Sequence, residues 1–254
     1  MKKYILLVGF AFAGQYSQAQ TLKNILKSAD KVLNNNSSGQ QNQGTILGGL
    51  GSNVSNTEVV SGLREALKIS AQNSSKKLNV VNGFFGNQLI KIVMPKEVSK
   101  IEATLRQFGF NKQCDQLILS LNRAAEDASG KAVPIFINAI TNMNINDGLA
   151  ILRGGNNAAT NFLKQATTTA LTQAFRPVIE KSLAKVNAPA LWNSVFATYN
   201  KLPISRQKVN TDLTGYVTER ALAGLFTTVA QEEANIRSNP SAQVTGLLKK
   251  VFGS

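Results

Sequence analysis

The residues best placed to do chemistry in this sequence are two adjacent glutamates, Glu232 and Glu233. If their segment is a helix with about 100° of rotation per residue, both carboxylates lie at the edges of one apolar stripe. That stripe consists of Leu222, Leu225, Val229 and Ile236. A carboxylate at such a position needs a partner, because an unpaired buried charge is unstable. The candidate partners are Arg64, Arg153, Arg176 and Arg237, of which the last stands four residues after Glu233.

Two interpretations of these acids and arginines remain open. In the first, they form an ionic network that fixes how one helix lies against another. In the second, they line a polar pocket in a helical core and bind a cation or the polar head of an amphiphilic ligand. We favour the network and keep the pocket as the alternative.

The rest of the composition excludes several kinds of active site. The chain has no histidine, so the commonest general base, the usual hydrolase triad and most zinc sites are excluded together. Its only cysteine, Cys114, cannot form an internal disulfide, and its position near Leu117 and Ile118 predicts a buried thiol. No segment has the spaced acids of a calcium loop. We therefore expect no enzyme activity, no cofactor and no metal, and a carboxylate-based hydrolase is the most distant alternative.

A second candidate site is the sequence "RGGNN" at residues 153–157. Gly154 or Gly155 suits the left-handed conformation that ends a helix, and Asn156 or Asn157 suits the cap of the next helix. The alternative is an anion-binding helix start in which free backbone amides act together with Arg153. The segment lacks the Lys-Ser or Lys-Thr and the preceding strand of a Walker phosphate loop. We favour the purely structural interpretation.

The net charge of the chain indicates which partners its surface could attract. The formal net charge is +14, which attracts anionic partners, but the basic residues are scattered and lack the interleaved aromatic residues of a nucleic-acid platform. No nucleic-acid partner is expected. Lys23, Lys27 and Lys31 lie on one side of an amphipathic segment, and they are candidates for contact with an anionic membrane surface or an envelope protein. The alternative is that its leucines pack on the main domain.

The chain divides into four parts. Residues 1–19 combine two lysines, a short apolar stretch and a small-x-small ending, which predicts a signal peptide cleaved near Ala19 and an exported, periplasmic or extracellular protein. Residues 20–33 form the basic amphipathic helix, and residues 34–45 form a flexible tether rich in Asn, Gln, Ser and Gly. Residues 46–254 are expected to form a single helical domain.

Helical periodicity dominates that domain and predicts an all-α, multi-helix bundle. Helices are expected at residues 57–77, 95–108, 112–129, 134–143, 146–152, 212–237 and 241–252, with Asn146 as a cap. Another begins after the "RGGNN" segment and buries a stripe of mainly alanines that includes Ala166 and Ala170, and Pro177 should kink or break it. The β-branched residues of 88–95 also permit one short β-hairpin near residues 80–94.

Five ordered segments carry a resemblance to a known family. They read "SGLREALKIS", "LNRAAEDA", "ILRGGNNAATNFL", "FRPVIEKSLAKV" and "YVTERALAGLFTTVAQEEANIRSNPSAQVTGLLKKVFG". Over residues 56–253 the chain resembles an exported bacterial family called domain of unknown function 4197. The resemblance implies a helical envelope protein and no activity, cofactor or site. We therefore expect a non-enzymatic binding or scaffolding module of the envelope, with a helical carrier of a lipid-like ligand as the alternative.

Overall fold

The described part of the chain consists of α-helices and irregular connections. The computed structural model describes residues 55–95, 98–190, 192–193 and 212–238, and no β-strand occurs among them. The all-α prediction is confirmed. The helices are α2 (Asn56–Leu78), α3 (Ser99–Gln107), α4 (Asn111–Ser129), α5 (Ala132–Asn142), α6 (Ile145–Arg153), α7 (Ala158–Ala184) and α9 (Leu213–Ser238). Four predictions lie outside the described residues: the signal peptide, the helix with Lys23, Lys27 and Lys31, the tether and the helix at 241–252.

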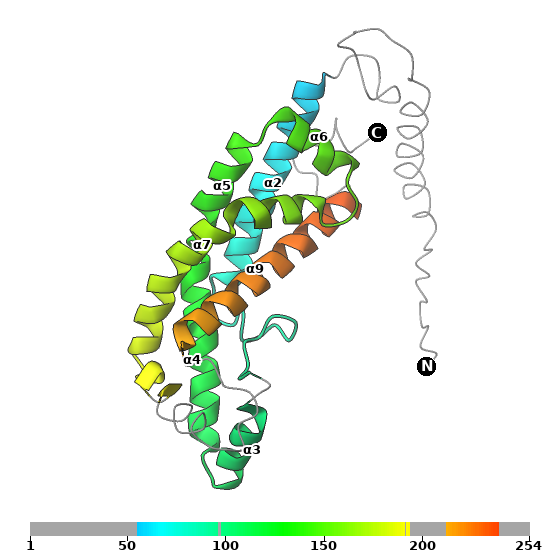
Figure 1. The fold of residues 1–254 in the computed structure, drawn as a ribbon. Helices are drawn as coiled ribbons and strands as arrows, with labels where there is room; N and C mark the ends of the chain where they lie inside the picture. The colour runs from blue at the N-terminus through cyan, green and yellow to red at the C-terminus, as the bar shows by residue number, and fades with distance from the viewer. Residues whose placement is uncertain (1–54, 96–97, 191, 194–211, 239–254) are drawn as a thin grey trace, which may run out of the picture.

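α7 and α9 lie side by side and antiparallel, with the start of α7 against the end of α9, and the other described helices pack around them (Figure 1). α7 packs against both α9 and α4, while α2 packs against α5 and α9. α4 extends to one end of the molecule, where it meets the short helix α3 (Figure 1). This arrangement buries Cys114, as its apolar neighbours predict, and burial raises the pKa of its thiol.

Two helices begin with reciprocal side-chain caps. Ser55 accepts a hydrogen bond from the N–H of Glu58, whose carboxylate accepts from the N–H of Ser55, and this pair starts α2. Asn144 and Asp147 form the same arrangement at the start of α6. The prediction that Asn146 caps this helix is therefore wrong by two residues. Asn144 takes the role because its extended backbone lets its side chain reach the amide three residues later.

The buried face of α7 differs from the predicted stripe of alanines. Ala166 and Ala170 are exposed, and Pro177 lies inside a helix that bends but continues to Ala184 (Figure 1). The buried residues instead recur at every fourth position: Leu163, Thr167, Leu171, Phe175, Ile179 and Leu183. Larger side chains bury more apolar area than alanines, so they determine how the helix is rotated. A four-residue repeat also winds slowly around the helix, which suits packing against both α9 and α4.

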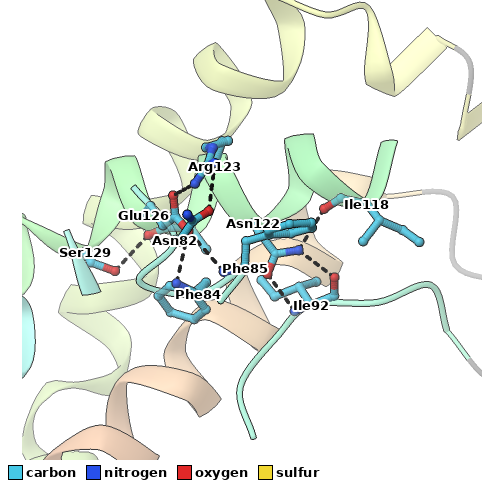
Figure 2. Close-up of polar contacts among 10 residues, drawn as sticks. Asn82, Phe84, Phe85, Ile92, Ile118, Asn122, Arg123, Glu126 and Ser129 are labelled. Carbon is cyan, nitrogen blue, oxygen red and sulfur yellow. Dashed lines mark hydrogen bonds and ion pairs between the residues drawn. The ribbon is translucent and has the colours of Figure 1, made fainter. Parts of the chain in front are cut away.

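The segment at residues 80–94 is not the predicted β-hairpin, because it forms turns and extended backbone without strand pairing. Its backbone pairs with side chains of α4 instead (Figure 2). The fully buried Asn122 accepts a hydrogen bond from the N–H of Ile92 at 2.8 Å and donates one to the C=O of Ile92 at 2.7 Å. One amide side chain thus makes both bonds that a partner strand would have made.

Glu126 attaches the first turn of the same segment to α4. One of its carboxylate oxygens accepts hydrogen bonds from the N–H groups of Phe84 at 3.0 Å and Phe85 at 3.1 Å. The other oxygen pairs with Arg123, which also donates to the side chain of Asn82 (Figure 2). Asn82 has a φ of 69°, a left-handed conformation that asparagine tolerates. The buried carboxylate is therefore fully partnered and holds an otherwise irregular turn.

Gly224 of α9 lets this segment pack closely on the other side. A Cβ at this position would lie 2.5 Å from the ring of Phe84 and 3.2 Å from Cβ of Ile90. Gly224→Ala should therefore lower the free energy of unfolding by about 1–3 kcal/mol, although alanine favours helix more than glycine. Urea denaturation measures the change. Gly155→Ala is the control, because a Cβ there meets nothing within 4 Å; equal stability of the two variants would contradict the close approach.

Candidate functional site

The carboxylate of Glu233 caps the N-terminus of α7. Glu233 is 5% exposed and accepts hydrogen bonds from the N–H groups of Ala159 at 3.1 Å and Thr160 at 2.9 Å. It also accepts from the hydroxyl of Thr160 at 2.7 Å and pairs with Arg237 at 2.9 Å. The first amides of a helix and its dipole favour an anion. The anion at this helix start is therefore supplied by the protein itself, from α9.

The "RGGNN" segment adopts a different geometry from the predicted one. Gly154 is extended, and the left-handed residue is Asn157, with a φ of 72°. A glycine is needed at position 154 because the backbone there packs closely against Ala158: a Cβ would lie 2.5 Å from Cβ of Ala158. The prediction that an asparagine side chain caps α7 is wrong for Asn157, which makes no cap hydrogen bond. The left-handed backbone of Asn157 starts α7, and the carboxylate of Glu233 accepts hydrogen bonds from the first N–H groups of that helix.

Arg153, Gly155 and Asn156 are solvent-exposed or nearly so and do not contact Glu233. The helix start that was a candidate for anion binding thus has backbone N–H groups that bind a carboxylate. Those amides are already engaged by an internal carboxylate, so they are not available to an external phosphate.

Glu232, the neighbouring acid, ties α9 to α2. It is 5% exposed and forms an ion pair with Lys77, whose long side chain reaches it from the surface. Lysine was not among the predicted partners, which were all arginines. The two adjacent glutamates therefore point to different elements: Glu232 to α2 and Glu233 to α7.

Of the four predicted arginine partners, the structure brings only Arg237 to the glutamates, where it also donates to the C=O of Ile151. Arg64 donates instead to the C=O of Met143, the residue that ends α5, where carbonyls attract cations. Arg153 is exposed. The predicted joint network of acids and arginines is therefore wrong for Arg64, which has another partner, and for Arg153, which faces solvent.

Arg176, the fourth arginine, pairs with Asp212 at 2.7 Å just before α9. Burial by itself would raise the pKa of the Asp212 carboxyl. The N–H of Gly215, at 2.8 Å, and the Arg176 guanidinium outweigh burial and hold that pKa below its usual value. This pair joins the middle of α7 to the start of α9.

The volume of the cavity beside Glu233 distinguishes an ionic network from a ligand pocket. The cavity that Glu233 lines has a volume of about 20 Å³. This is room for one water molecule and far below the several hundred Å³ of a small-molecule pocket. Ser70 lines the same cavity, and its hydroxyl has no hydrogen-bond partner in the part of the chain that the structure describes. The described residues also contain no cluster of three side chains suited to hold a metal ion.

A larger hollow lies on the surface between α7 and α9, and we call it the α7–α9 groove. It has a volume of about 680 Å³. Its residues are Asn157, Thr160, Asn161, Lys164, Thr168, Thr172, Arg176, Gly215, Thr218, Glu219, Leu222, Ala223, Phe226, Thr227 and Ala230. Gly215 and Ala230 are fifteen residues apart on α9, so the groove runs for about 22 Å.

The threonines make the α7–α9 groove less polar than its composition indicates. The hydroxyl of Thr172 donates to the C=O of Thr168, and the hydroxyl of Thr227 donates to the C=O of Ala223, each four residues back on its own helix. Thr168 and Thr218 do the same. A hydroxyl engaged in this way has used its only proton and can offer a ligand only an acceptor oxygen. What a ligand meets is therefore mainly methyl groups, together with the buried side chains of Leu222 and Phe226.

Sequence reasoning missed this groove and the polar anchors on α4. The run of threonines after Ala166 was a usable signal, since polar residues that bond to their own helix leave apolar methyls outside. Asn122 and Glu126 were visible too, because they stand four apart among the buried residues of α4. A polar side chain in a buried stripe requires a partner, and these two predict an irregular backbone segment packed against them.

The fold and these contacts define an all-α protein whose buried carboxylates connect helices and whose α7–α9 groove opens to solvent. The chain belongs to the family described as protein of unknown function (DUF4197), whose model matches residues 53–253. No curated protein and no solved structure matches the chain.

Proposed function

We propose that this protein is an exported, non-enzymatic binding or scaffolding module of the cell envelope. Export is supported by the leader at residues 1–19 and its small-x-small ending at Ala19. In the part of the chain that the structure describes, no helix is both long and apolar enough to cross a membrane. Lys23, Lys27 and Lys31 remain candidates for contact with an anionic membrane surface or an envelope protein.

The observation that carries the proposal is the α7–α9 groove. Its apolar floor, methyl-lined sides and length of about 22 Å suit the apolar face of a helix of about fifteen residues. Lys164 on α7 and Glu219 on α9 offer charges of both signs at its edges. We propose that the groove binds an amphipathic helix of a partner protein.

The two competing functions have less support. A carrier that encloses a lipid-like ligand near Glu232 and Glu233 needs space there, and the cavity beside Glu233 is about 20 Å³. A hydrolase that uses the same carboxylates needs them to be free, whereas Glu232 pairs with Lys77 and Glu233 accepts from α7. Both acids are explained by their structural contacts.

Site-specific photo-crosslinking tests the groove. A photoreactive phenylalanine analogue placed at Ala223, which is exposed in the groove, should form one discrete cross-linked product with a partner in the envelope. Thr168→Arg, which puts a charge across the groove, should abolish that product. The same analogue at Gln231, exposed on α9 outside the groove, is the matched control and should give no such product.

Two results would overturn this proposal. One is the absence of a specific product from Ala223. The other is a product that joins Ala223 to residues 239–254 of the same chain, since this would assign the groove to the protein's own carboxyl-terminal segment.

A further inference from the structure

Two phenylalanines are exposed at the turn between α3 and α4. Phe108 is 76% exposed and Phe110 is 46% exposed, and Gly109 between them has a φ of +88°. The N–H of Phe110 donates to the C=O of Leu105 at 3.0 Å, and the N–H of Gly109 donates to the C=O of Arg106 at 3.1 Å. These two bonds are typical of a glycine-ended helix. The backbone is therefore well ordered while both rings face solvent.

The turn lies at one end of the molecule, where α3 meets the start of α4 (Figure 1). Arg106 braces it by pairing with Glu102 on α3 and with Asp115 on α4, each at 2.8 Å. The three groups together carry a net charge of −1, because one guanidinium faces two carboxylates. Lys100 and Lys112 are exposed, and neither forms an ion pair with a described residue. With Lys100 and Lys112 the described residues at this end therefore carry a net charge of +1, beside two exposed aromatic rings.

We propose that Phe108 and Phe110 insert into the interface of a bilayer that contains anionic lipids, with Lys100 and Lys112 at the level of the headgroups. A bilayer accepts isolated aromatic side chains at its interface, and basic residues are attracted to its anionic lipids. A stable protein partner requires about 800 Å² on each side, whereas two phenylalanines offer about 150–250 Å² each. The small area and the charge therefore favour a lipid surface. The proposal rests on the envelope location proposed above and is independent of the groove.

Vesicle sedimentation of residues 20–254 tests the insertion. Vesicles of phosphatidylglycerol and phosphatidylcholine should bind the protein, and vesicles of phosphatidylcholine alone should bind it weakly. Phe108→Ser combined with Phe110→Ser should weaken binding to the anionic vesicles by about tenfold or more, because two rings lose their apolar burial. Leu89→Ser is the matched control, since Leu89 is also 76% exposed but lies away from this turn. An equal loss in both variants, or a loss in neither, would overturn the proposal.

A depth probe separates this contact from one made by Lys23, Lys27 and Lys31. Phe108→Trp should show a blue shift of its fluorescence on anionic vesicles and quenching by brominated lipid. The existing Trp192 is 1% exposed and should change little. If the protein binds vesicles but Trp at position 108 is neither shifted nor quenched, the protein attaches elsewhere and the insertion is refuted. The groove experiment is unaffected by either result.

Discussion

Replacing Glu233 with alanine should lower the free energy of unfolding by about 3–5 kcal/mol, the largest effect that we expect from one substitution. The change removes the acceptor for the backbone N–H groups of Ala159 and Thr160 and for the hydroxyl of Thr160. It also leaves Arg237, which is mostly buried, without its carboxylate. Buried donors that lose their only acceptor keep the full cost of desolvation.

Urea denaturation followed by circular dichroism measures this loss. Glu219→Ala is the matched control, because Glu219 is exposed on the same helix and should change stability by less than about 0.5 kcal/mol. Glu232→Ala should fall between the two, since its partner Lys77 keeps a largely exposed side chain. A change below about 1 kcal/mol for Glu233→Ala would mean that water replaces the carboxylate at the start of α7, contrary to our interpretation.

Asn122→Leu should destabilise the protein by about 2–4 kcal/mol. Leucine is similar in size but leaves the N–H and C=O of Ile92 without the bonds of 2.8 and 2.7 Å that Asn122 makes. Ile92 and Asn122 are both fully buried, so water does not readily take over these bonds. The loss should be local first, and the segment at residues 80–94 should detach from α4.

Urea denaturation and amide hydrogen exchange distinguish a local loss from a general one. The N–H of Ile92 should exchange much faster in Asn122→Leu, while amides in the middle of α7 change only with global stability. Gln116→Leu, an exposed polar position on the same helix, is the control and should leave both measurements unchanged. Persistent protection of the Ile92 amide in Asn122→Leu would show that the side chain of residue 122 is not the anchor.

Together these two positions show how the described part of the chain, which has no strands, holds its irregular segments. Glu233 and Asn122 each satisfy backbone groups from a distant segment, in one case the start of a helix and in the other an extended stretch. Both lie on long helices that are already held by apolar packing. The polar side chains then determine the position of the elements that have little apolar surface of their own.

The sequence by itself determined the helical class, the family and most helix positions, because these depend on local periodicity. It also determined that Glu232 and Glu233 lie at the edge of a buried stripe. The tertiary structure alone decided their partners: Lys77 for one and the start of α7, more than seventy residues away, for the other. It also decided that Leu171 and Phe175 rather than Ala166 and Ala170 face the core, and that Asn157 rather than a glycine is left-handed. Rotation per residue is a local property of a helix. How two helices pack against each other depends on the total apolar area that the whole chain buries, and no short stretch of sequence determines that area.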